Sequence, residues 1–550
     1  MDFTPKAPSK NASCERPGVN LQDGVRAKHP VVMLPGIVTT GLELWSGEDC
    51  AKGYFRQRMW GTMTMVQNML LNTKCWLRHM ALDPVTGLDP PNIKLRSAQG
   101  FEAADFVVGG YWVWSKLIEN LADIGYDPSS MFMASYDWRL AYPLLEDRDQ
   151  FFTRLSSQVE VMVDGNGAKA ILVAHSMGGN VLFYFLHWAT ANRRRDWVDK
   201  YIHSVVGLAI PWLGVPKGIS AVLSGEAKDT AEMGVMGGIL DHHLPRRERR
   251  RLFRSWGSAP SMFPKGGDVF WGGRNKSFPA PDLLDDEEKA WKCASLLHME
   301  GEDLSVEEAI DYVLESSSKG PVQDGQLANY HKWYSHGLRT TPFENDSRKR
   351  KRTHRSSDKS EQCSSQELGN ETKYWTNPLE MPLPFAPNLT IYCLYGVGKE
   401  TERSYFYKRT NKNISKNQTD DAQDMEDVEW RIDTALEDSM TSLGIIRGHG
   451  DGSVPLLSLG FMCQRGWKTR HWNPAGSKTV IREYVHEPSS NFIDMRGGDT
   501  SADHVDIMGN RHMINDVLMI ASVTKHNDCG HDDDSDGDGH AQGEQVEASR

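Results

Sequence analysis

A short buried strand that runs directly into a turn of small residues is the feature that most constrains the fold of this chain. Residues 170–173 (AILV) form an uninterrupted apolar run, typical of a strand that is covered on both faces. Residues 174–179 (AHSMGG) follow at once, and residues 180–189 have the composition of a buried helix. The sequence therefore predicts a strand, a tight turn and a helix in immediate succession, with Ser176 at the turn.

Such a turn is typical of a nucleophile elbow, in which a serine hydroxyl projects above the carboxyl edge of a parallel sheet. The crowded backbone requires small residues two positions before and after the serine. Ala174 and Gly178 meet this requirement, although glycine is usual at the first position. The alternative is an ordinary helix start capped by a serine. The strand before the turn and the small neighbours favour the elbow.

Other segments extend this pattern into an α/β fold. Apolar runs predict further strands, and apolar residues at helical spacing predict helices between them. Because strands and helices alternate and several strands are apolar throughout, we expect an α/β-hydrolase fold with a mostly parallel central sheet that is covered on both faces. The predicted strands are 31–34, 131–134 and 204–210, and the predicted helices are 111–124 and 151–163.

The 550 residues allow one large domain with insertions, or two domains. We expect a polar N-terminal arm over residues 1–28, followed by the α/β domain over 29–525. Residues 344–372 are rich in charge and serine and predict a disordered insertion. Residues 526–550 read as an acidic disordered tail; the tail lacks the closing Glu and the flanking helices of a calcium loop, so no metal site is expected there.

Charge and hydropathy exclude several classes of protein. The net charge of −12 argues against general nucleic-acid binding, which requires a basic face. The basic run 246–251 is expected to be a solvated loop, with a nuclear-localisation or anionic-lipid patch as the alternative. No stretch is long and apolar enough to predict a membrane span, and the first ten residues do not predict a secretory signal.

Two features bear on the compartment. Eight cysteines in a chain of this length do not make a disulfide scaffold, but Cys50 and Cys75 bracket a compact apolar segment. From the residues alone, a bridge between them remains open. Glycosylation sequons favour a lumenal compartment slightly; they begin at Asn11, Asn275, Asn345, Asn370, Asn388, Asn413 and Asn417.

A serine nucleophile needs a base and an orienting acid, which in this fold follow the serine in the order acid, then histidine. Asp451 lies in a glycine-rich loop, and His504 precedes an apolar helical stretch that runs to about residue 520. Each signal is weak by itself, and their joint occurrence in this order makes Ser176, Asp451 and His504 the predicted triad. His175 and His449 are closer in sequence to the serine and the acid, but each shares a tight turn with its neighbour and cannot readily face it.

The oxyanion of an acyl-transfer reaction needs two backbone N–H donors. Met177, directly after the serine, is the first candidate. The second should lie in the loop after an early strand, and Val38 in the segment LPGIV is the choice, with Ile37 as the alternative. A plain strand-ending turn would explain the same segment.

With these residues in hand, the chain resembles the lecithin:cholesterol acyltransferase superfamily over roughly residues 29–525, and within it the phospholipid:diacylglycerol acyltransferases. Long segments carry the resemblance, among them HPVVMLPGIVTTGLELW, CWLRHMALDPVTGLDPPNIKLR, SYDWRLAYP, AHSMGGNVL and HVDIMGN. The resemblance implies the same triad. It also implies that Cys50 and Cys75 close a lid by a disulfide and that Trp45 and Trp60 lie near the lipid entrance.

The resemblance implies transfer of a fatty acyl group from a phospholipid to diacylglycerol, without metal or cofactor. A phospholipase A or sterol O-acyltransferase with the same residues is the alternative, and a non-catalytic lipid-binding relative is the rival from another class. The expected partners are phospholipid, diacylglycerol and a membrane or lipid-droplet surface, at the lumenal face of the endoplasmic reticulum, although the usual N-terminal anchor is not visible. A second family disulfide is expected to be broken, because Met440 stands where the partner of Cys463 would lie.

Overall fold

The computed structural model describes most of the predicted α/β domain. The described residues are 16–21, 24–108, 111–225, 244–273, 279–280, 283, 285–318, 325–338, 372–409, 430–490 and 496–524. The predicted tail 526–550 lies outside these residues, as does the predicted insertion 344–372 except for its last residue. The described part of the predicted arm contains α1 (Pro17–Leu21) and β1 (Val25–Ala27). β1 pairs with β19 (Ser522–Thr524) and so joins the two ends of the domain.

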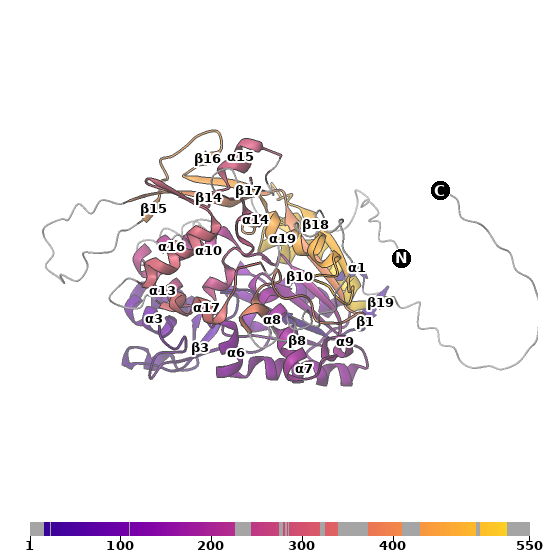
Figure 1. Ribbon diagram of the computed structural model, residues 1–550. Coiled ribbons are helices and arrows are strands. Elements are labelled where there is room, and N and C mark those ends of the chain that lie inside the picture. Colours follow the sequence, from indigo (N-terminus) through magenta and orange to yellow (C-terminus); the bar gives the residue numbers. More distant parts are fainter. Residues whose placement is uncertain are drawn as a thin grey trace, which may run out of the picture.

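A six-stranded sheet forms the centre of the molecule (Figure 1), and all of its neighbouring strands run parallel. The α/β fold expected from the sequence is therefore confirmed. The helices α7 (Phe151–Asn166) and α8 (Met177–Asn192) pack against the inner strand β9. In spatial order the strands are β18 (Lys478–Val485), β13 (Thr390–Val397), β10 (Ile202–Leu208), β9 (Ala170–His175), β2 (Val31–Leu34) and β8 (Met131–Met133).

The strand order places the candidate site. β2 pairs with β8 on one side and with β9 on the other. The next strand along the chain in this sheet, β8, therefore lies on one side of β2, and the strand after it, β9, lies on the opposite side. In open α/β sheets, ligands bind at the carboxyl ends of the strands where the order reverses in this way. Ser176 follows β9 and the LPGIV segment follows from β2, so both lie at this point of reversal.

A lid region separates β2 from β8 in the sequence. It contains a small antiparallel sheet of β3 (Leu42–Ser46), β4 (Arg58–Trp60) and β5 (Lys94–Ser97). The 3-10 helix η1 (Asp49–Tyr54), α2 (Met63–Leu71) and α3 (Thr73–Met80) complete it. A disulfide joins Cys50 to Cys75, as the resemblance implied. We call residues 50–75 the lid loop.

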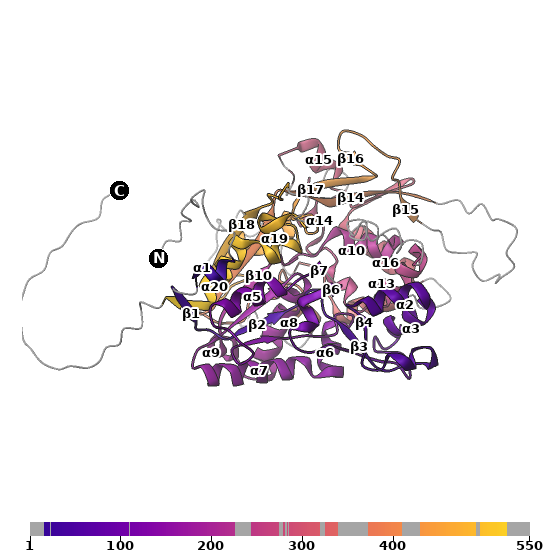
Figure 2. The ribbon, with the colours of Figure 1, turned by 180° about the vertical axis from the view of Figure 1, so that it is seen from behind.

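A second sheet was not foreseen from the sequence. It is antiparallel apart from the pairing of β11 with β14. The sheet lies at the top of the molecule in Figure 1, and α10 (Pro216–Ser224) packs against β14. Figure 2 shows the same arrangement from behind. Its strands are β11 (Leu297–Met299), β12 (Glu302–Leu304), β14 (Lys399–Arg409), β15 (Trp430–Ile432), β16 (Thr441–Ser442) and β17 (Ile445–Gly450).

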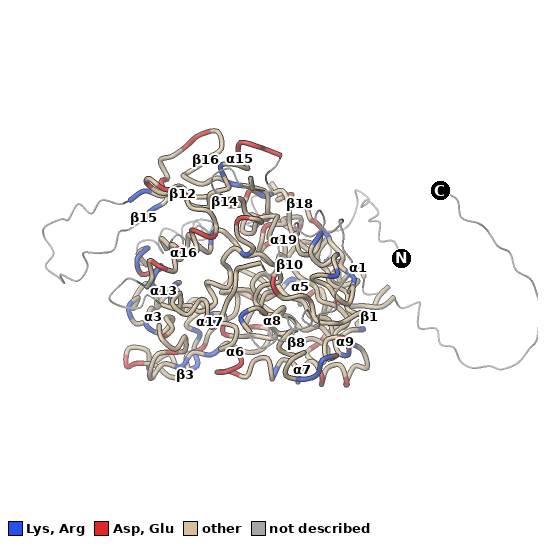
Figure 3. Tube along the Cα trace, viewed as in Figure 1, with Lys and Arg blue, Asp and Glu red and all other residues tan. Residues whose placement is uncertain are grey.

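The structure corrects three sequence expectations. Cys463 is not left without a partner, because it forms a disulfide with Cys393 of the central strand β13. The expected helix over 111–124 begins later, as α5 (Ser115–Asp123), because Tyr111 and Trp112 form strand β7 and pair with β6 (Phe106–Val108). The basic run 246–251 is not a solvated loop but part of helix α13 (Arg246–Ser255), where Figure 3 shows basic segments. Two arginines of the run, Arg249 and Arg250, are buried.

A buried ion network holds the loop after β8. Arg139 is fully buried and contacts Asp137 at 2.7 Å and Asp89 at 2.9 Å, and Arg148 joins both carboxylates. Burial alone would raise the pKa of Asp137, but the two guanidinium groups hold that pKa below its usual range. The network fixes the neighbouring Trp138, whose indole N–H donates to the carbonyl of Thr40 at 2.9 Å. This edge of the sheet therefore supports the loop that follows β2.

Candidate active site

Ser176 lies at the turn between β9 and α8, in the position that the elbow prediction requires. Its backbone has φ 54° and ψ −133°, a conformation that a residue with a side chain rarely adopts. The small neighbours are needed here because a Cβ atom on Gly178 would lie 2.4 Å from the carbonyl oxygen of Pro35. Ala174 is accommodated at the other side, where its partner across the sheet in β10 is Gly207. The surrounding backbone thus holds Ser176 in a strained turn.

Three side chains from distant parts of the sequence meet at this turn. His504 Nε2 lies 2.9 Å from Ser176 Oγ, and His504 Nδ1 lies 2.8 Å from Asp451 Oδ2. Asp451 is fully buried, and Ser176 and His504 are 5% and 8% exposed. With Nδ1–H donated to the carboxylate, Nε2 is left to accept the serine proton. The structure therefore brings together the three residues that the sequence placed in one constellation.

Backbone groups orient the acid. Asp451 follows β17 of the second sheet, and its other oxygen, Oδ1, accepts N–H bonds from Ser453 at 3.0 Å and Val454 at 2.7 Å. The backbone N–H of His504 donates to the carbonyl of Asp451 at 3.0 Å. Both carboxylate oxygens are thus engaged, which leaves the Asp451 side chain little freedom to rotate away from the imidazole.

The two histidines considered as alternatives make other contacts. His175 Nε2–H donates to the backbone carbonyl of His504 at 2.9 Å, and the centroids of the two imidazole rings are 5.2 Å apart. Burial, with a smaller contribution from the charge of His504, lowers the pKa of His175 to about 3, so the ring is neutral. His449 is exposed and contacts Asp285 at 2.9 Å. His175 therefore braces the loop of the candidate base, a contact that sequence reasoning missed.

Ion pairs on both sides of His504 fix its loop. Lys399 contacts Asp503, and Arg496 donates from Nε to Asp506 at 2.7 Å. The guanidinium of Arg496 also lies 4.1 Å from the ring centroids of both Tyr111 and Trp112. Burial raises the pKa of Asp506 to about 6, because the nearby Arg496 only partly offsets it. The sequence held one signal of this arrangement, the acidic residues at 503 and 506 on either side of the histidine.

The predicted oxyanion donors lie on two segments beside the serine. Met177 is the first residue of α8, where backbone N–H groups have no partner within the helix. Val38 follows β2, and its φ of 58° is rare for a β-branched residue. A Cβ atom on Gly36, in the same loop, would lie 3.0 Å from Ser176 Cβ, so this loop packs directly against the nucleophile. Val38, or Ile37 beside it, stays a prediction as the second donor.

The two tryptophans expected near the lipid entrance have different surroundings. Trp45 is 43% exposed and packs edge-on against Phe55, with Arg56 over its ring. Trp60 is half-buried and its ring contacts those of Trp76, Trp138 and Trp256. A role in lipid binding stays a prediction for both.

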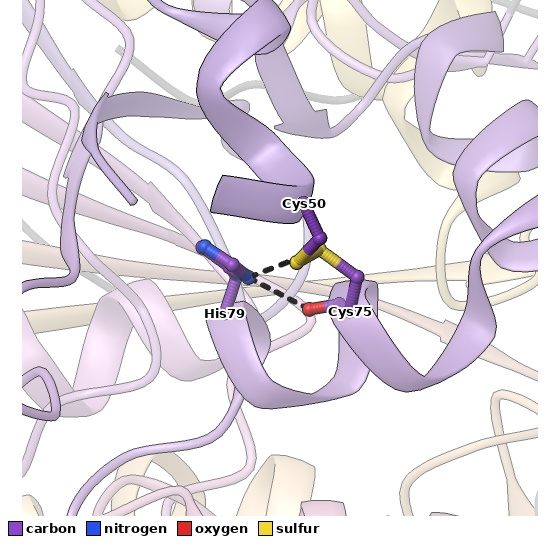
Figure 4. Close-up of side chains that lie close together, drawn as sticks. All are labelled: Cys50, Cys75 and His79. Carbon is purple, nitrogen blue, oxygen red and sulfur yellow. Dashed lines mark hydrogen bonds between the residues drawn. A yellow bond between two sulfur atoms is a disulfide. The ribbon is translucent and has the colours of Figure 1, made fainter. Parts of the chain in front are cut away.

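One cluster in the described part of the chain has metal-ligating residue types at close range, formed by Cys50, Cys75 and His79 (Figure 4). Both sulfur atoms belong to the disulfide and offer no thiolate. The His79 ring is also engaged: Nδ1 lies 2.7 Å from the carbonyl oxygen of Cys75, and Nε2 accepts the N–H of Glu48 at 3.2 Å. The cluster therefore reads as a lid support rather than a metal centre.

Comparison with known proteins gives a consistent result. The family described as lecithin:cholesterol acyltransferase matches residues 54–511. A protein of Schizosaccharomyces pombe named phospholipid:diacylglycerol acyltransferase is 39% identical over 534 residues, covering 94% of this chain and 77% of that protein. The Arabidopsis thaliana protein named phospholipid:diacylglycerol acyltransferase 1 is 38% identical and covers 94% and 84%. A phospholipid–sterol O-acyltransferase of the same plant is 29% identical but covers only 47% of this chain and 42% of its own.

Proposed function

This chain belongs to the lecithin:cholesterol acyltransferase family, and from that premise we propose that it transfers a fatty acyl group from a phospholipid to diacylglycerol, forming triacylglycerol and lysophospholipid. The similarity to proteins named for this reaction extends over nearly the whole chain, whereas similarity to the sterol acyltransferase covers less than half of it. The observation that carries the chemistry is the chain of contacts from Asp451 through His504 to Ser176.

The first half-reaction forms an acyl-enzyme. Ser176 Oγ attacks the carbonyl carbon of a phospholipid ester while His504 Nε2 takes the hydroxyl proton and Asp451 holds the imidazole. The carbonyl oxygen becomes an oxyanion, which the N–H groups of Val38 and Met177 stabilise. The bond to the glycerol oxygen then breaks, and this oxygen takes the proton from His504. Lysophospholipid leaves, and the acyl group stays on Ser176.

The second half-reaction transfers the acyl group. A hydroxyl of diacylglycerol gives its proton to His504 Nε2 as its oxygen attacks the acyl-serine. Ser176 recovers the proton when the tetrahedral intermediate collapses to triacylglycerol. Transfer exceeds hydrolysis only where water is kept from the acyl-serine. The burial of Ser176 and His504 supports such a site.

We also propose that the protein acts at a membrane or lipid-droplet surface. Large apolar side chains around the lid loop face solvent, among them Phe55, Met63 and Leu71 at 60%, 55% and 86% exposure. Exposed apolar residues gathered in one region are typical of membrane or partner surfaces. Among the residues that the structure describes, no helix has the length and apolar content needed to cross a bilayer.

The lumenal face of the endoplasmic reticulum is the proposed compartment. Two disulfides, Cys50–Cys75 and Cys393–Cys463, support an oxidising environment. Within the described residues, the sequon at Asn388 lies on an exposed loop before β13, where its amide Nδ2 donates to Asp199 at 3.0 Å. If the protein is lumenal, peptide N-glycosidase treatment of the cellular protein should increase its mobility on a gel, and Asn388→Gln should remove one glycan step. A protein whose mobility is unchanged by the glycosidase would contradict the lumenal assignment.

The reaction is tested with purified protein, phospholipid labelled in one acyl chain, and unlabelled diacylglycerol. We expect label in triacylglycerol, and a loss of at least about 10³-fold in Ser176→Ala, because the acyl-enzyme cannot form. Ser442→Ala, an exposed serine of the second sheet, is the matched control and should retain full activity. Label found only as free fatty acid would make the enzyme a phospholipase A, and label in added sterol would make it a sterol O-acyltransferase. Equal transfer of label in Ser176→Ala would contradict the mechanism, and the absence of any labelled product in both proteins would favour a non-catalytic lipid-binding role.

A further inference from the structure

Four tryptophans from separate elements form one cluster, which joins the lid loop to its neighbours. Trp60 of β4 is its centre: the ring centroids of Trp138, Trp76 and Trp256 lie 5.1, 6.2 and 6.4 Å away. The other three rings are almost completely buried, and Trp60 is half-buried. These spacings are those of stacked and edge-to-face aromatic pairs, so the cluster is closely packed.

Each indole N–H of this cluster donates to a backbone carbonyl. The bond from Trp76 to Met59, at 2.8 Å, lies within the lid region. The bond from Trp256 ends on Met80, the last residue of α3, at 3.0 Å. The other two end on the loop after β2. Trp138 donates to Thr40 at 2.9 Å, and Trp60 donates to Val38 at 2.7 Å.

The bond from Trp60 ends on the most strained residue of that loop. Val38 has φ 58°, which crowds a β-branched side chain against its own backbone. Free of restraint, such a residue returns to negative φ by rotating its flanking peptide groups. One of these groups carries the N–H proposed to bind the oxyanion. A strained conformation persists only where surrounding contacts hold it, and the Trp60 bond fixes the carbonyl of Val38 itself.

We propose that Trp60 is a positioning residue, which holds the strained Val38 turn and thereby aims the oxyanion donor of this loop at the acyl carbonyl. Because Trp60 belongs to the lid loop, the same bond links the disulfide-closed lid to the reacting centre. The proposal rests on the acyl-serine chemistry given above. It differs from the expectation that Trp60 lines the lipid entrance, because a lining residue acts on substrate binding and a positioning residue acts on the transition state.

The test compares Trp60→Phe with Trp256→Phe in the full-length protein. Both variants keep an aromatic ring and lose one indole hydrogen bond of the same cluster, part-buried for Trp60 and buried for Trp256, but only the first bond ends on the Val38 loop. Hydrolysis of a soluble p-nitrophenyl ester reports acyl-enzyme formation without any lipid acceptor. We expect Trp60→Phe to lower kcat about tenfold or more, with KM within about twofold, since loss of a full oxyanion donor costs about 10²- to 10³-fold. Trp256→Phe should stay within about twofold in both.

Two binding measurements separate positioning from lipid contact. A long-chain trifluoromethyl ketone adds to Ser176 and places an oxyanion at the donor site, so its inhibition constant should rise in Trp60→Phe by the factor that kcat/KM loses. A diether phospholipid cannot be cleaved, and its affinity for Ser176→Ala with and without Trp60→Phe should be equal. Replacement of Trp60 by benzothienylalanine removes only the N–H and should reproduce the Phe variant, which covers the case in which that variant folds poorly.

The outcomes distinguish the two proposals. Unchanged kcat in a folded Trp60→Phe or benzothienylalanine protein would overturn the positioning role. A raised KM with weaker diether-lipid binding and unchanged kcat would overturn it in favour of the lipid entrance. If the wild-type protein forms no triacylglycerol yet its ester hydrolysis falls in Trp60→Phe, the acceptor assignment fails and the role of Trp60 stands.

Discussion

The floor and the lid of the candidate site are built in opposite ways. The floor, formed by β2, β9 and the start of α8, is buried and tightly packed: all four residues of β2 have no exposed surface. The lid loop is held by one disulfide and carries side chains such as Leu71 at 86% exposure. The close packing of the floor fixes the position of Ser176. The lid loop is fixed at its disulfide, and its outer surface carries exposed apolar side chains. A site that acts on lipid needs both, because the chemistry requires fixed geometry and the substrate must leave a bilayer.

The largest difference is expected between two glycines, one in each region. A Cβ atom on Gly178 would lie 2.4 Å from a backbone oxygen, while one on Gly53 of the lid loop would meet nothing within 4 Å. We expect Gly178→Ala to lower the free energy of unfolding by more than about 3 kcal/mol, because backbone on both sides must shift. Gly53→Ala should change it by less than about 0.5 kcal/mol. Urea unfolding followed by tryptophan fluorescence measures both, and similar values for the two variants would show that the floor is as tolerant as the lid.

The next largest effect is expected from the lid disulfide. Cys50 and Cys75 are 25 residues apart, and the chain-entropy model gives such a bridge about 3 kcal/mol. In Cys50→Ser/Cys75→Ser we expect a loss of this size, concentrated in the lid loop, because the floor has its own packing. Hydrogen exchange should show faster exchange for amides of α2 and α3 and unchanged exchange for β2 and β9. Faster exchange in β9 would mean that the lid supports the floor and would remove the contrast between them.

A smaller effect is expected from pH, and it should arise in the buried helix α8, whose start belongs to the floor. His187 of α8 is fully enclosed, burial lowers its pKa to about 3, and its Nε2 has no hydrogen-bond partner among the described residues. The unfolded histidine takes up a proton near pH 6.5, so the native state is favoured above that pH and loses stability as the pH falls towards 3. The slope is at most about 1.4 kcal/mol per pH unit for each such histidine.

His187→Phe replaces the imidazole by a ring that cannot be protonated. The ring at position 187 contacts two aromatic side chains, Phe183 and Trp375. We expect the variant to lose less stability than the wild type between pH 6.5 and pH 4.5, as measured by urea unfolding at each pH. Burial also lowers the pKa of His175 to about 3 and that of His203 to about 4, so both should contribute to the slope that remains. If the free energy of unfolding of the variant depends on pH as that of the wild type does, the lowered pKa of His187 does not contribute to the pH dependence of stability.

The floor could be predicted from the sequence because its signals are local. The strand, the elbow and the following helix occupy consecutive residues, and the requirement for Gly178 follows from one turn. Asp451 and His504 could be found by chain order within a fold already inferred. The sequence could not show that Asp451 is carried by a second antiparallel sheet, because its short strands are separated by long segments of the chain.

The lid and the second disulfide depended on contacts between distant residues. Cys463 pairs with Cys393 across 70 residues, and the expectation of a broken bridge was wrong because position 440 was taken as the only partner. The family resemblance implied that Trp60 lies near the lipid entrance. Its bond to Val38 depends on how β4 pairs with β3, and no local pattern reports that pairing.

The smallest effect on stability, and the sharpest separation of the two regions, is expected from the outer surface of the lid. Phe55 and Leu71 are 60% and 86% exposed, so Phe55→Ser/Leu71→Ser removes little folded-state packing and should change the free energy of unfolding by less than about 0.5 kcal/mol. If these side chains enter a lipid surface, their loss forfeits about 1 kcal/mol or more each, and binding to phosphatidylcholine vesicles should weaken by about thirtyfold or more in a sedimentation assay. Val161→Ser, an equally exposed apolar residue on α7 at 68%, is the matched control and should leave vesicle binding unchanged. Hydrolysis of a soluble ester should be the same in all three proteins, because the floor is untouched. Equal loss of binding in Val161→Ser would mean that exposed apolar area in general, and not the lid, governs the contact with lipid.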